Sequence, residues 1–251
     1  MKEPPSISVL FEPIARAHVD LAGATAVVID AIRATTTIVA ALAAGCHEVR
    51  TFRTPEEVLA EAGRRPAGTV VTAGERNGVR IEGLDLNNSP SVMTPDRIGG
   101  RTLLLTTTNG TVAIHDALPA HTILIAAMPN RRAIAGRILA IGRRVVFVSA
   151  GTVGTVSCED TLVAGAVIAA MIDVPARSGG SSTWHLEDSA RVALAAWRGS
   201  ADCLGQTFRE TRGGRATAQL DLDADLAVCS QVDTMDVVPV VQGDPPVITA
   251  D

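Results

Sequence analysis

The sequence has few aromatic side chains, an excess of acids over bases and no apolar run of membrane-spanning length. Aromatic residues make up 2% of its 251 residues, which leaves few surfaces on which nucleic-acid bases could stack. The formal net charge of −5 at pH 7 disfavours binding to a phosphate backbone. The N-terminal segment MKEPPSISVLFEP carries acids and prolines where a signal peptide would be continuously apolar. We therefore expect neither nucleic acid nor a membrane as a partner.

Paired spacings typical of metal sites or disulfide frameworks are absent as well. No two cysteines form a CxxC pair, so neither a zinc knuckle nor a disulfide framework is indicated, and a cytoplasmic location is expected. The histidines show no paired ligand spacing, and only His115 is kept as a candidate for proton transfer. The widely spaced cysteines are Cys46, Cys158, Cys203 and Cys229.

Motifs of several other phosphate-handling and hydrolytic enzymes are missing or stand in the wrong context. There is no GxxxxGK[ST] loop, which argues against an NTP-driven kinase or ATPase, and no GxSxG elbow. Cys203 precedes Arg209 by the six residues that a thiol phosphatase requires. That segment predicts a helix with a single glycine, whereas an activated thiolate needs a glycine-rich loop between strand and helix. A thiol mechanism is therefore not expected.

Short β-branched segments alternate with segments of helical pattern. The alternation predicts an α/β fold with three layers, α/β/α, around a largely parallel or mixed sheet. With 47% apolar composition, residues 1–251 suffice for a single domain, in which residues 184–251 either complete the fold or form a C-terminal capping subregion. A flexible connector is expected at 175–183. The predicted strands are Ala26–Asp30, Thr69–Thr72, Thr102–Thr106, Thr122–Ala126, Arg144–Ser149 and a closing VVPVV strand. The predicted helices are Thr35–Ala44, one that begins at Thr54, Arg131–Ile141, Thr161–Ile172 and one around Trp184–Trp197.

Ligands of open α/β sheets bind at the carboxyl ends of strands, so the polar residues that follow strands are the candidate site. Asp30 ends one such strand, and Arg33 and a run of threonines follow it at a helix start. The carboxylate could hold a metal ion or attack phosphorus, and the planar guanidinium could bind an oxyanion. The hydroxyls of Thr35 and Thr36 are candidate anion ligands. The alternative is that Asp30 only caps the helix, with Arg33 as its surface partner.

The long loop after the next strand carries the carboxylates of Glu75 and Asp85, together with Arg76, Asn88 and Ser89. A long loop inside a compact domain is more often functional than idle. The acids are candidates for catalysis, and the other three side chains are candidates for binding an anion. The alternative is a turn-rich excursion in which these residues serve only backbone geometry.

A third strand leads through a hydroxyl-rich turn into a helix. Hydroxyls and backbone N–H groups at such a junction are natural ligands for phosphate or sulfonate oxygens. The alternative is an ordinary Asn-Gly turn with the last threonine near the N-cap. The candidate ligands are Thr107, Thr108, Asn109, Gly110 and Thr111.

The fourth loop contains glycines that let the backbone approach a ligand, and it ends in two adjacent acids. Gly151 and Thr152 are candidate ligands for a substrate, and Glu159 and Asp160 lie at the next helix start. Hard oxygen ligands suit Mg²⁺, which takes one or two carboxylates and completes its shell with water and ligand oxygens. The competing interpretation is a capping box of Ser157 and Asp160, which would not use Glu159.

Five motifs lie in order along the chain: D-x-x-R-A-T-T-T at Asp30–Thr37, G-E-R at Gly74–Arg76, I-E-G-x-D-L-x-N-S-P at Ile81–Pro90, L-T-T-T-N-G-T at Leu105–Thr111, and A-G-T-x-G-x-x-S-x-E-D at Ala150–Asp160. Together they resemble the family of 2-phosphosulfolactate phosphatases. The departures are Asn87, where a glycine is usual, and the pair Arg131-Arg132, where small apolar residues are expected. The resemblance implies an α/β, Mg²⁺-dependent enzyme that removes phosphate from 2-phosphosulfolactate on the route to coenzyme M.

The expected protein is thus a phosphatase that releases sulfolactate and phosphate from a small anionic phosphoester. Asp30, Arg33, Glu75 and Asp85 are the predicted catalytic residues. Mg²⁺ is expected at Asp30 together with acids among Glu75, Asp85, Glu159 and Asp160. One alternative is the same fold acting on another short phospho-acid. The other is a non-catalytic anion-binding module, against which the cluster of acids argues. Assembly into a homo-oligomer is left open.

Overall fold

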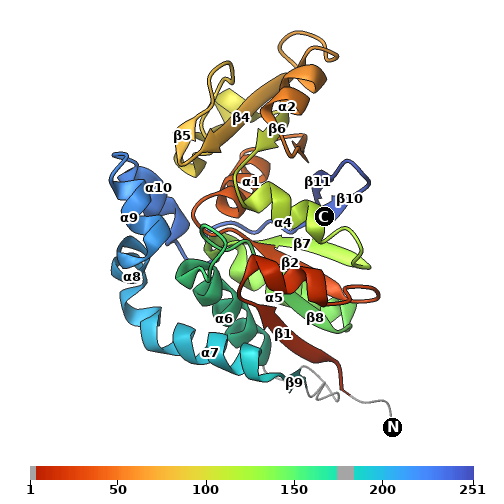
Figure 1. Ribbon diagram of the computed structural model, residues 1–251, viewed down its shortest axis with the longest axis vertical. Helices are drawn as coiled ribbons and strands as arrows, with labels where there is room; N and C mark the ends of the chain where they lie inside the picture. Colours follow the sequence, from red (N-terminus) through yellow and green to blue (C-terminus); the bar gives the residue numbers. More distant parts are fainter. Residues whose placement is uncertain (1–3, 174–183) are drawn as a thin grey trace.

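Eleven strands within the described residues, 4–173 and 184–251, form one sheet in the computed structural model (Figure 1). Helices cover both faces, so the predicted α/β class is confirmed. The strands are β1 (Ser6–Leu10), β2 (Thr25–Ile29), β3 (Glu48–Thr51), β4 (Val70–Arg76), β5 (Val79–Arg80), β6 (Thr102–Thr106), β7 (Thr122–Ala126), β8 (Val145–Ser149), β9 (His185–Leu186), β10 (Pro239–Gln242) and β11 (Val247–Ala250). The α-helices are α1 (Ala34–Ala43), α2 (Pro55–Ala62), α3 (Pro95–Ile98), α4 (Gly110–Asp116), α5 (Arg131–Ile141), α6 (Cys158–Ile172), α7 (Asp188–Ser200), α8 (Leu204–Glu210), α9 (Arg212–Ala218) and α10 (Asp223–Cys229).

Alternation along the strands divides the core between the two faces of the sheet. In β2, Val27 and Ile29 pack in one cluster with side chains of α5, α6 and α7. Ala26 and Val28 pack in a second cluster with side chains of α1 and α4. Every residue of β2, β6 and β8 is buried, as expected for strands that are covered on both sides.

The sheet consists of two parallel sets joined by an antiparallel hairpin. β4, β6 and β3 form one set, with β5 antiparallel at its outer edge, and β7, β2, β8, β1 and β9 form the other. Between them, β11 runs antiparallel to β3, β10 antiparallel to β11, and β7 antiparallel to β10. These three reversals orient the two sets in opposite senses along the sheet.

Twist brings the carboxyl ends of the two sets together despite this opposition. Neighbouring strands rotate by roughly 20–25° on average, and the order β6-β3-β11-β10-β7-β2 contains five such steps. At this average twist, five steps would add up to about 100–125° and would turn β2 and β6 well away from an antiparallel arrangement. The loops after β2 and β8 can therefore meet those after β4 and β6.

The predicted helix signals are confirmed at two positions. The Thr54 hydroxyl accepts a hydrogen bond from the backbone N–H of Glu57, and the Glu57 carboxylate accepts one from the backbone N–H of Thr54. This capping box forms the N-terminus of α2. α5 ends at Gly142, which adopts the left-handed conformation at φ 66°. No described helix is both long and apolar enough to cross a membrane.

The C-terminal segment contributes to the sheet as well as to its cover. The predicted VVPVV strand is β10, and together with β11 it lies in the middle of the sheet rather than at an edge. α8, α9 and α10 lie together at one side of the molecule (Figure 1). The connector predicted at 175–183 lies outside the described residues.

Candidate active site

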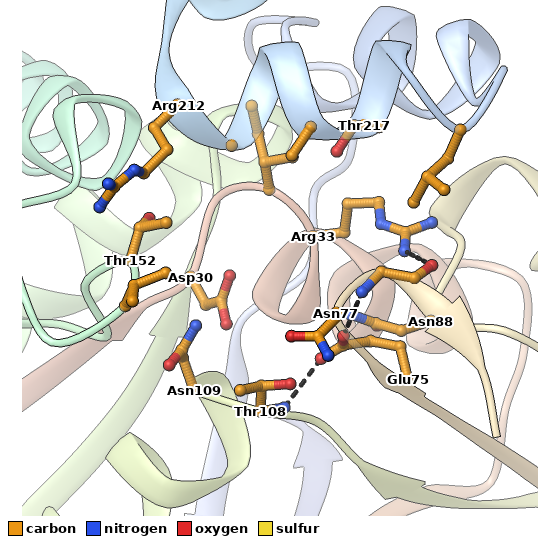
Figure 2. A pocket seen from close by; sticks show the side chains of 16 residues that line it. Asp30, Arg33, Glu75, Asn77, Asn88, Thr108, Asn109, Thr152, Arg212 and Thr217 are labelled. Atoms are coloured by element: carbon orange, nitrogen blue, oxygen red, sulfur yellow. Dashed lines mark hydrogen bonds between the residues drawn. The ribbon is translucent and has the colours of Figure 1, made fainter.

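A cavity of about 440 Å³ lies where four strand-end loops meet α9 (Figure 2). We call its lining residues from the loops the floor: Asp30, Ile32, Arg33, Glu75, Asn77, Gly78, Asn88, Thr108, Asn109, Thr152 and Val153. We call its lining residues from α9 and just beyond the roof: Arg212, Gly213, Ala216, Thr217 and Leu220. A concave site of this size is typical of small-molecule binding.

Asp30 faces the cleft from the end of β2 (Figure 2). The Thr35 hydroxyl fixes its backbone by accepting from Asp30 N at 3.1 Å and donating to Asp30 O at 2.9 Å. Burial first, and the charge of Glu75 second, raise the pKa of the Asp30 carboxyl to about 7, although the N–H of Ala34 opposes the shift. The N-cap position of α1 is held by Arg33 and not by Asp30, although the Ala34 N–H at the helix start does interact with the Asp30 carboxylate.

The start of α4 passes close to the Asp30 carboxylate. A Cβ at Gly110 would lie 2.6 Å from Asp30 Oδ2 and 2.5 Å from Ala34 Cβ. Glycine is therefore needed because the side chains of Asp30 and Ala34 lie against this backbone, and Gly110 does not line the cleft as a ligand-binding residue.

Glu75 joins two loops of the floor. Its Oε1 accepts from the N–H of Thr108 at 2.8 Å, and its Oε2 accepts from the N–H of Gly78 at 2.7 Å. These bonds fix the end of β4 against the loop after β6. Glu75 thus lines the cleft as predicted, with both oxygens already bound to backbone.

Asp160 does the same for the loops after β2 and β8. Its Oδ1 accepts from Ala31 N at 2.8 Å and its Oδ2 from Gly151 N at 3.1 Å. Burial, followed by the charges of Asp30 and Glu159, raises the pKa of Asp160 well above its usual range. Both oxygens serve the backbone, so the structure does not support Asp160 as a metal ligand.

Half of the predicted capping box at α6 is present. The Ser157 hydroxyl accepts from the N–H of Asp160 at 3.2 Å. The carboxylate does not return to Ser157 because it binds Ala31 and Gly151 instead.

Glu159 lies beneath the roof with 2% of its surface exposed. Burial raises the pKa of its carboxyl, while the backbone near the helix start and the Thr211 hydroxyl oppose the shift. Glu159 Oε2 is buried without a hydrogen-bond partner in the part of the chain that the structure describes. A side chain at Gly213 would clash with Glu159 Oε1, so the roof approaches this acid closely.

No three His, Cys, Asp or Glu side chains within residues 4–173 and 184–251 are arranged to hold a metal ion. Mg²⁺ nevertheless fits sites with one or two carboxylates, because water and substrate oxygens complete its shell. The Asp30 carboxylate faces the cleft, and Glu159 Oε2 is an unpaired hard donor beneath the roof. The donor set thus fits Mg²⁺ through these two acids.

Arg33 lines the cleft but is also paired inside the protein. Its Nη1 donates to Asp225 Oδ2 at 2.7 Å, and its Nη2 donates to the carbonyl of Gly78 at 3.1 Å. The alternative that Arg33 is a surface partner of Asp30 is therefore wrong, because Arg33 is buried and pairs with Asp225. The second arginine of the cleft is Arg212 of the roof, whose Nη1 lies 3.4 Å from Thr155 Oγ1.

The structure brings seven of the predicted site residues to the floor: Asp30, Arg33, Glu75, Asn88, Thr108, Asn109 and Thr152. They come from the loops that follow both parallel sets of strands. The sequence analysis had expected them at the carboxyl ends of one largely parallel sheet.

Four predicted threonine ligands are turned into the fold instead. Thr36 donates to the carbonyl of Ala31 at 2.8 Å. Thr107 and Thr111 bond each other's backbone across the start of α4, as in the turn alternative. With Thr35 bound to the backbone of Asp30, these hydroxyls shape the loops and do not line the cleft.

Four further predicted residues do not line the cleft: Asp85, Arg76, Ser89 and Gly151. Asp85 is exposed, and its Oδ2 accepts from the backbone N–H and the hydroxyl of Thr72. Arg76 donates to the carbonyls of Glu75 and Arg53. The catalytic role of Asp85 and the ligand-binding role of Arg76 are corrected on these grounds.

Ser89 and Gly151 have structural positions of their own. Ser89 is buried and donates to Asp225 at 2.5 Å. Gly151 adopts φ +75°, and a Cβ there would lie 2.7 Å from both Pro13 Cδ and Thr155 O. Neither lines the cleft.

The roof was missed from the sequence, as were Asn77 and Val153 of the floor. The stretch Thr211–Arg215, T-R-G-G-R, carried a usable signal, because arginines beside glycines in an acidic protein mark a place for an anion. Asp225 had no such signal.

The cysteines, the histidine and the arginine pair that the sequence analysis considered separately do not line the cleft either. Cys203 is exposed at the start of α8 rather than in a strand-to-helix loop, and neither it nor Cys158 lines the cleft. His115 Nε2 contacts the carbonyl of Thr51 at 3.1 Å, away from the site. Arg131 pairs with Asp233, so the unusual arginines there do not reach the cleft.

A twisted α/β sheet with carboxylates and arginines around a strand-end cleft is compatible with several enzymes that act on anions. A family model described as 2-phosphosulpholactate phosphatase matches residues 13–244, nearly the whole chain. The protein is therefore a phosphoric monoester hydrolase. It belongs to the 2-phosphosulpholactate phosphatase family.

Relatives of similar length support this membership. The chain is 39% identical over 233 residues to a probable 2-phosphosulfolactate phosphatase of Synechococcus sp. (strain CC9605), covering 92% of this chain and 94% of the relative. It is 37% identical over 218 residues to a protein of the same description from Clostridium botulinum (strain Alaska E43 / Type E3), covering 87% and 89%. A third, from Deinococcus radiodurans, is 36% identical over 222 residues, covering 87% and 88%.

Proposed function

We propose that this protein is a Mg²⁺-dependent phosphatase that hydrolyses 2-phosphosulfolactate to sulfolactate and phosphate. The observation that carries the proposal is a single cleft with a carboxylate at Asp30 and arginines on two sides, Arg33 in the floor and Arg212 in the roof. The relatives that are described as probable 2-phosphosulfolactate phosphatases support the choice of substrate.

The cleft suits a short substrate with more than one acidic group. In Figure 2, Arg33 lies on the side of Asn77 and Arg212 on the side of Thr152. 2-Phosphosulfolactate carries a phosphate, a carboxylate and a sulfonate, and guanidinium forks bind such planar or tetrahedral oxyanions well. The hydroxyls of Thr108 and Thr152 add neutral hydrogen-bond partners along the floor.

Hydrolysis of a phosphomonoester depends mainly on positioning and charge neutralisation. Asp30 and Glu159 are the residues that would hold Mg²⁺. When bound there, the ion would act as a Lewis acid and neutralise charge on the phosphoryl group. Arg33 binds phosphoryl oxygens through N–H groups that Asp225 and Gly78 leave free. Asp30 orients the attacking water by accepting a hydrogen bond from it. The roof limits access of bulk water to the cleft.

A panel of short phospho-acids, assayed with EDTA and again after adding Mg²⁺, tests this proposal. We expect phosphate release from 2-phosphosulfolactate with the highest kcat/KM, loss with EDTA and recovery with Mg²⁺. Faster turnover of another member, such as phosphoglycolate, would reassign the substrate within the same reaction class. Binding without turnover of any member would support an anion-binding module instead, and full activity in EDTA would refute the metal requirement.

A further inference from the structure

Asp225 on α10 is fully buried and lies in the cluster of hydrogen bonds behind Arg33. Its Oδ2 accepts from Arg33 Nη1 at 2.7 Å. Its Oδ1 accepts from the hydroxyls of Ser89 and Ser91 at 2.5 and 2.6 Å, and from the N–H of Ser91 at 3.2 Å. One buried carboxylate thus joins three segments that are far apart in the sequence.

The arrangement fixes the orientation of the Arg33 guanidinium. Arg33 is 5% exposed, and two acceptors on different elements, Asp225 and Gly78, hold its two terminal nitrogens. A guanidinium has five N–H donors, so three have no partner among the described residues and are left for a ligand. Because the fork is planar and rigid, fixing two nitrogens also fixes where the others point.

Asp225 also connects Arg33 to the roof. α10 follows α9 after a short turn, so the helix that carries Asp225 continues the segment that covers the cleft. The bonds from Ser89 and Ser91 fasten the same carboxylate to the segment beside Asn88 of the floor. A shift of α10 would therefore turn the guanidinium away from its present direction.

We propose that Asp225 is a positioning residue that holds Arg33 in the orientation that binds the phosphoryl group and makes this binding depend on a seated roof. The inference rests on the proposed function, because it takes Arg33 to be an anion ligand. Asp225 itself does not contact the ligand, since it does not line the cleft and all its bonds go to Arg33, Ser89 and Ser91.

The test measures binding of inorganic phosphate by calorimetry to the full chain in the presence of Mg²⁺. Four proteins form a double-mutant cycle: wild type, Arg33→Ala, Asp225→Asn and the double variant. We expect Asp225→Asn to weaken phosphate binding about tenfold, or ~1.4 kcal/mol. In the Arg33→Ala background the same change should have no further effect, because the group that Asp225 orients is gone.

Two further variants keep the test decisive. Ser91→Ala removes one donor to Asp225 without changing charge, and should weaken phosphate binding in the same direction by less, again only when Arg33 is present. Asp223→Asn changes an exposed acid of the same helix, which pairs with Arg209 at the surface, and should leave phosphate binding unchanged. If Asp225→Asn does not fold, the Ser91→Ala cycle decides the question.

A loss of binding that is equal with and without Arg33 would make Asp225 a purely structural residue and overturn the inference. Unchanged binding in a folded Asp225→Asn protein would also overturn it. The proposed function fails separately, if wild type binds phosphate but hydrolyses no phosphomonoester. Wild type that binds no phosphate at all would remove the anion role of Arg33 and the inference with it.

Discussion

The floor of the cleft presents acids that are largely committed to the fold, whereas the roof presents a cation on a short helix with few bonds elsewhere. Glu75 and the underlying Asp160 each accept two backbone N–H bonds. Within residues 4–173 and 184–251, the one hydrogen bond of the Arg212 side chain is the long contact to Thr155. The floor therefore sets the positions of the reacting groups, and the roof adds charge and closes the site. Changes in the floor should mainly affect turnover, and changes in the roof should mainly affect binding.

Asp30→Asn should have the largest effect on turnover of any single change in the floor. Without the carboxylate, water is poorly oriented and Mg²⁺ loses a ligand, so we expect kcat to fall by at least ~100-fold. The melting temperature should not fall, because burial and Glu75 disfavour the charge at this position. Steady-state kinetics and thermal unfolding check both points.

Asp85→Asn is the matched control, because it changes an exposed acid that lies outside the cleft. Its turnover should stay near that of wild type. A folded Asp30→Asn protein with normal kcat would show that another residue acts in the chemical step. It would also contradict the proposal that changes in the floor mainly affect turnover.

Gly213→Ala should push the roof away from the floor. The added methyl group would clash with Glu159 Oε1. Overpacking of this kind costs about 1–3 kcal/mol, so kcat/KM should fall by about tenfold or more. Gly199→Ala in α7 is the control, because no atom lies within 4 Å of its Cβ position and alanine favours a helix. Equal activity of Gly213→Ala and Gly199→Ala would mean that close contact between the roof and Glu159 is not required for activity.

Arg212→Ala should raise KM with little change in kcat, in contrast to Asp30→Asn. Loss of a charged hydrogen bond to the substrate costs about 1.5–3 kcal/mol, so KM should rise by roughly tenfold or more. The melting temperature should be unchanged, since the 3.4 Å contact with Thr155 is exposed. Arg215→Ala, on the same helix but outside the cleft, should behave as wild type. A kcat defect in Arg212→Ala would show that the roof takes part in the chemical step.

The smallest effect concerns pH and stability of the metal-free protein. The pKa of Asp30 is raised from 3.8 to about 7, so the folded state binds this proton more tightly than the unfolded state. Its contribution to stability is full below about pH 4 and is lost as the pH rises through about 7. Relative to Asp30→Asn, the wild-type melting temperature should decrease as the pH rises between these two values. If the melting temperatures of wild type and Asp30→Asn changed in parallel over this pH range, the pKa of Asp30 would not be raised in the folded state.

The sequence predicted the strand-end loops because polar residues directly after β-branched strands have few other roles in this class of fold. It could not decide which hydroxyls face a ligand, because Thr107 and Thr111 use the same residue types for a helix start as for an anion site. The partner of Arg33 lies 192 residues away, so no local pattern could reveal it. The order of the sheet was equally inaccessible, since β10 and β11 enter between strands formed much earlier in the chain.

Insertion of β10 and β11 between the two parallel sets ties completion of the sheet to residues made late in synthesis. The paired residues Val49 and Ile248 lie 199 positions apart in the sequence, and Leu124 and Val240 lie 116 positions apart. Pairings of such long range form slowly. Until residues 239–250 leave the ribosome, β3 and β7 have no strand to pair with on their inner sides. Unpaired edges of this kind attract other chains, so nascent molecules of this protein are expected to be prone to aggregation and to benefit from chaperones during translation.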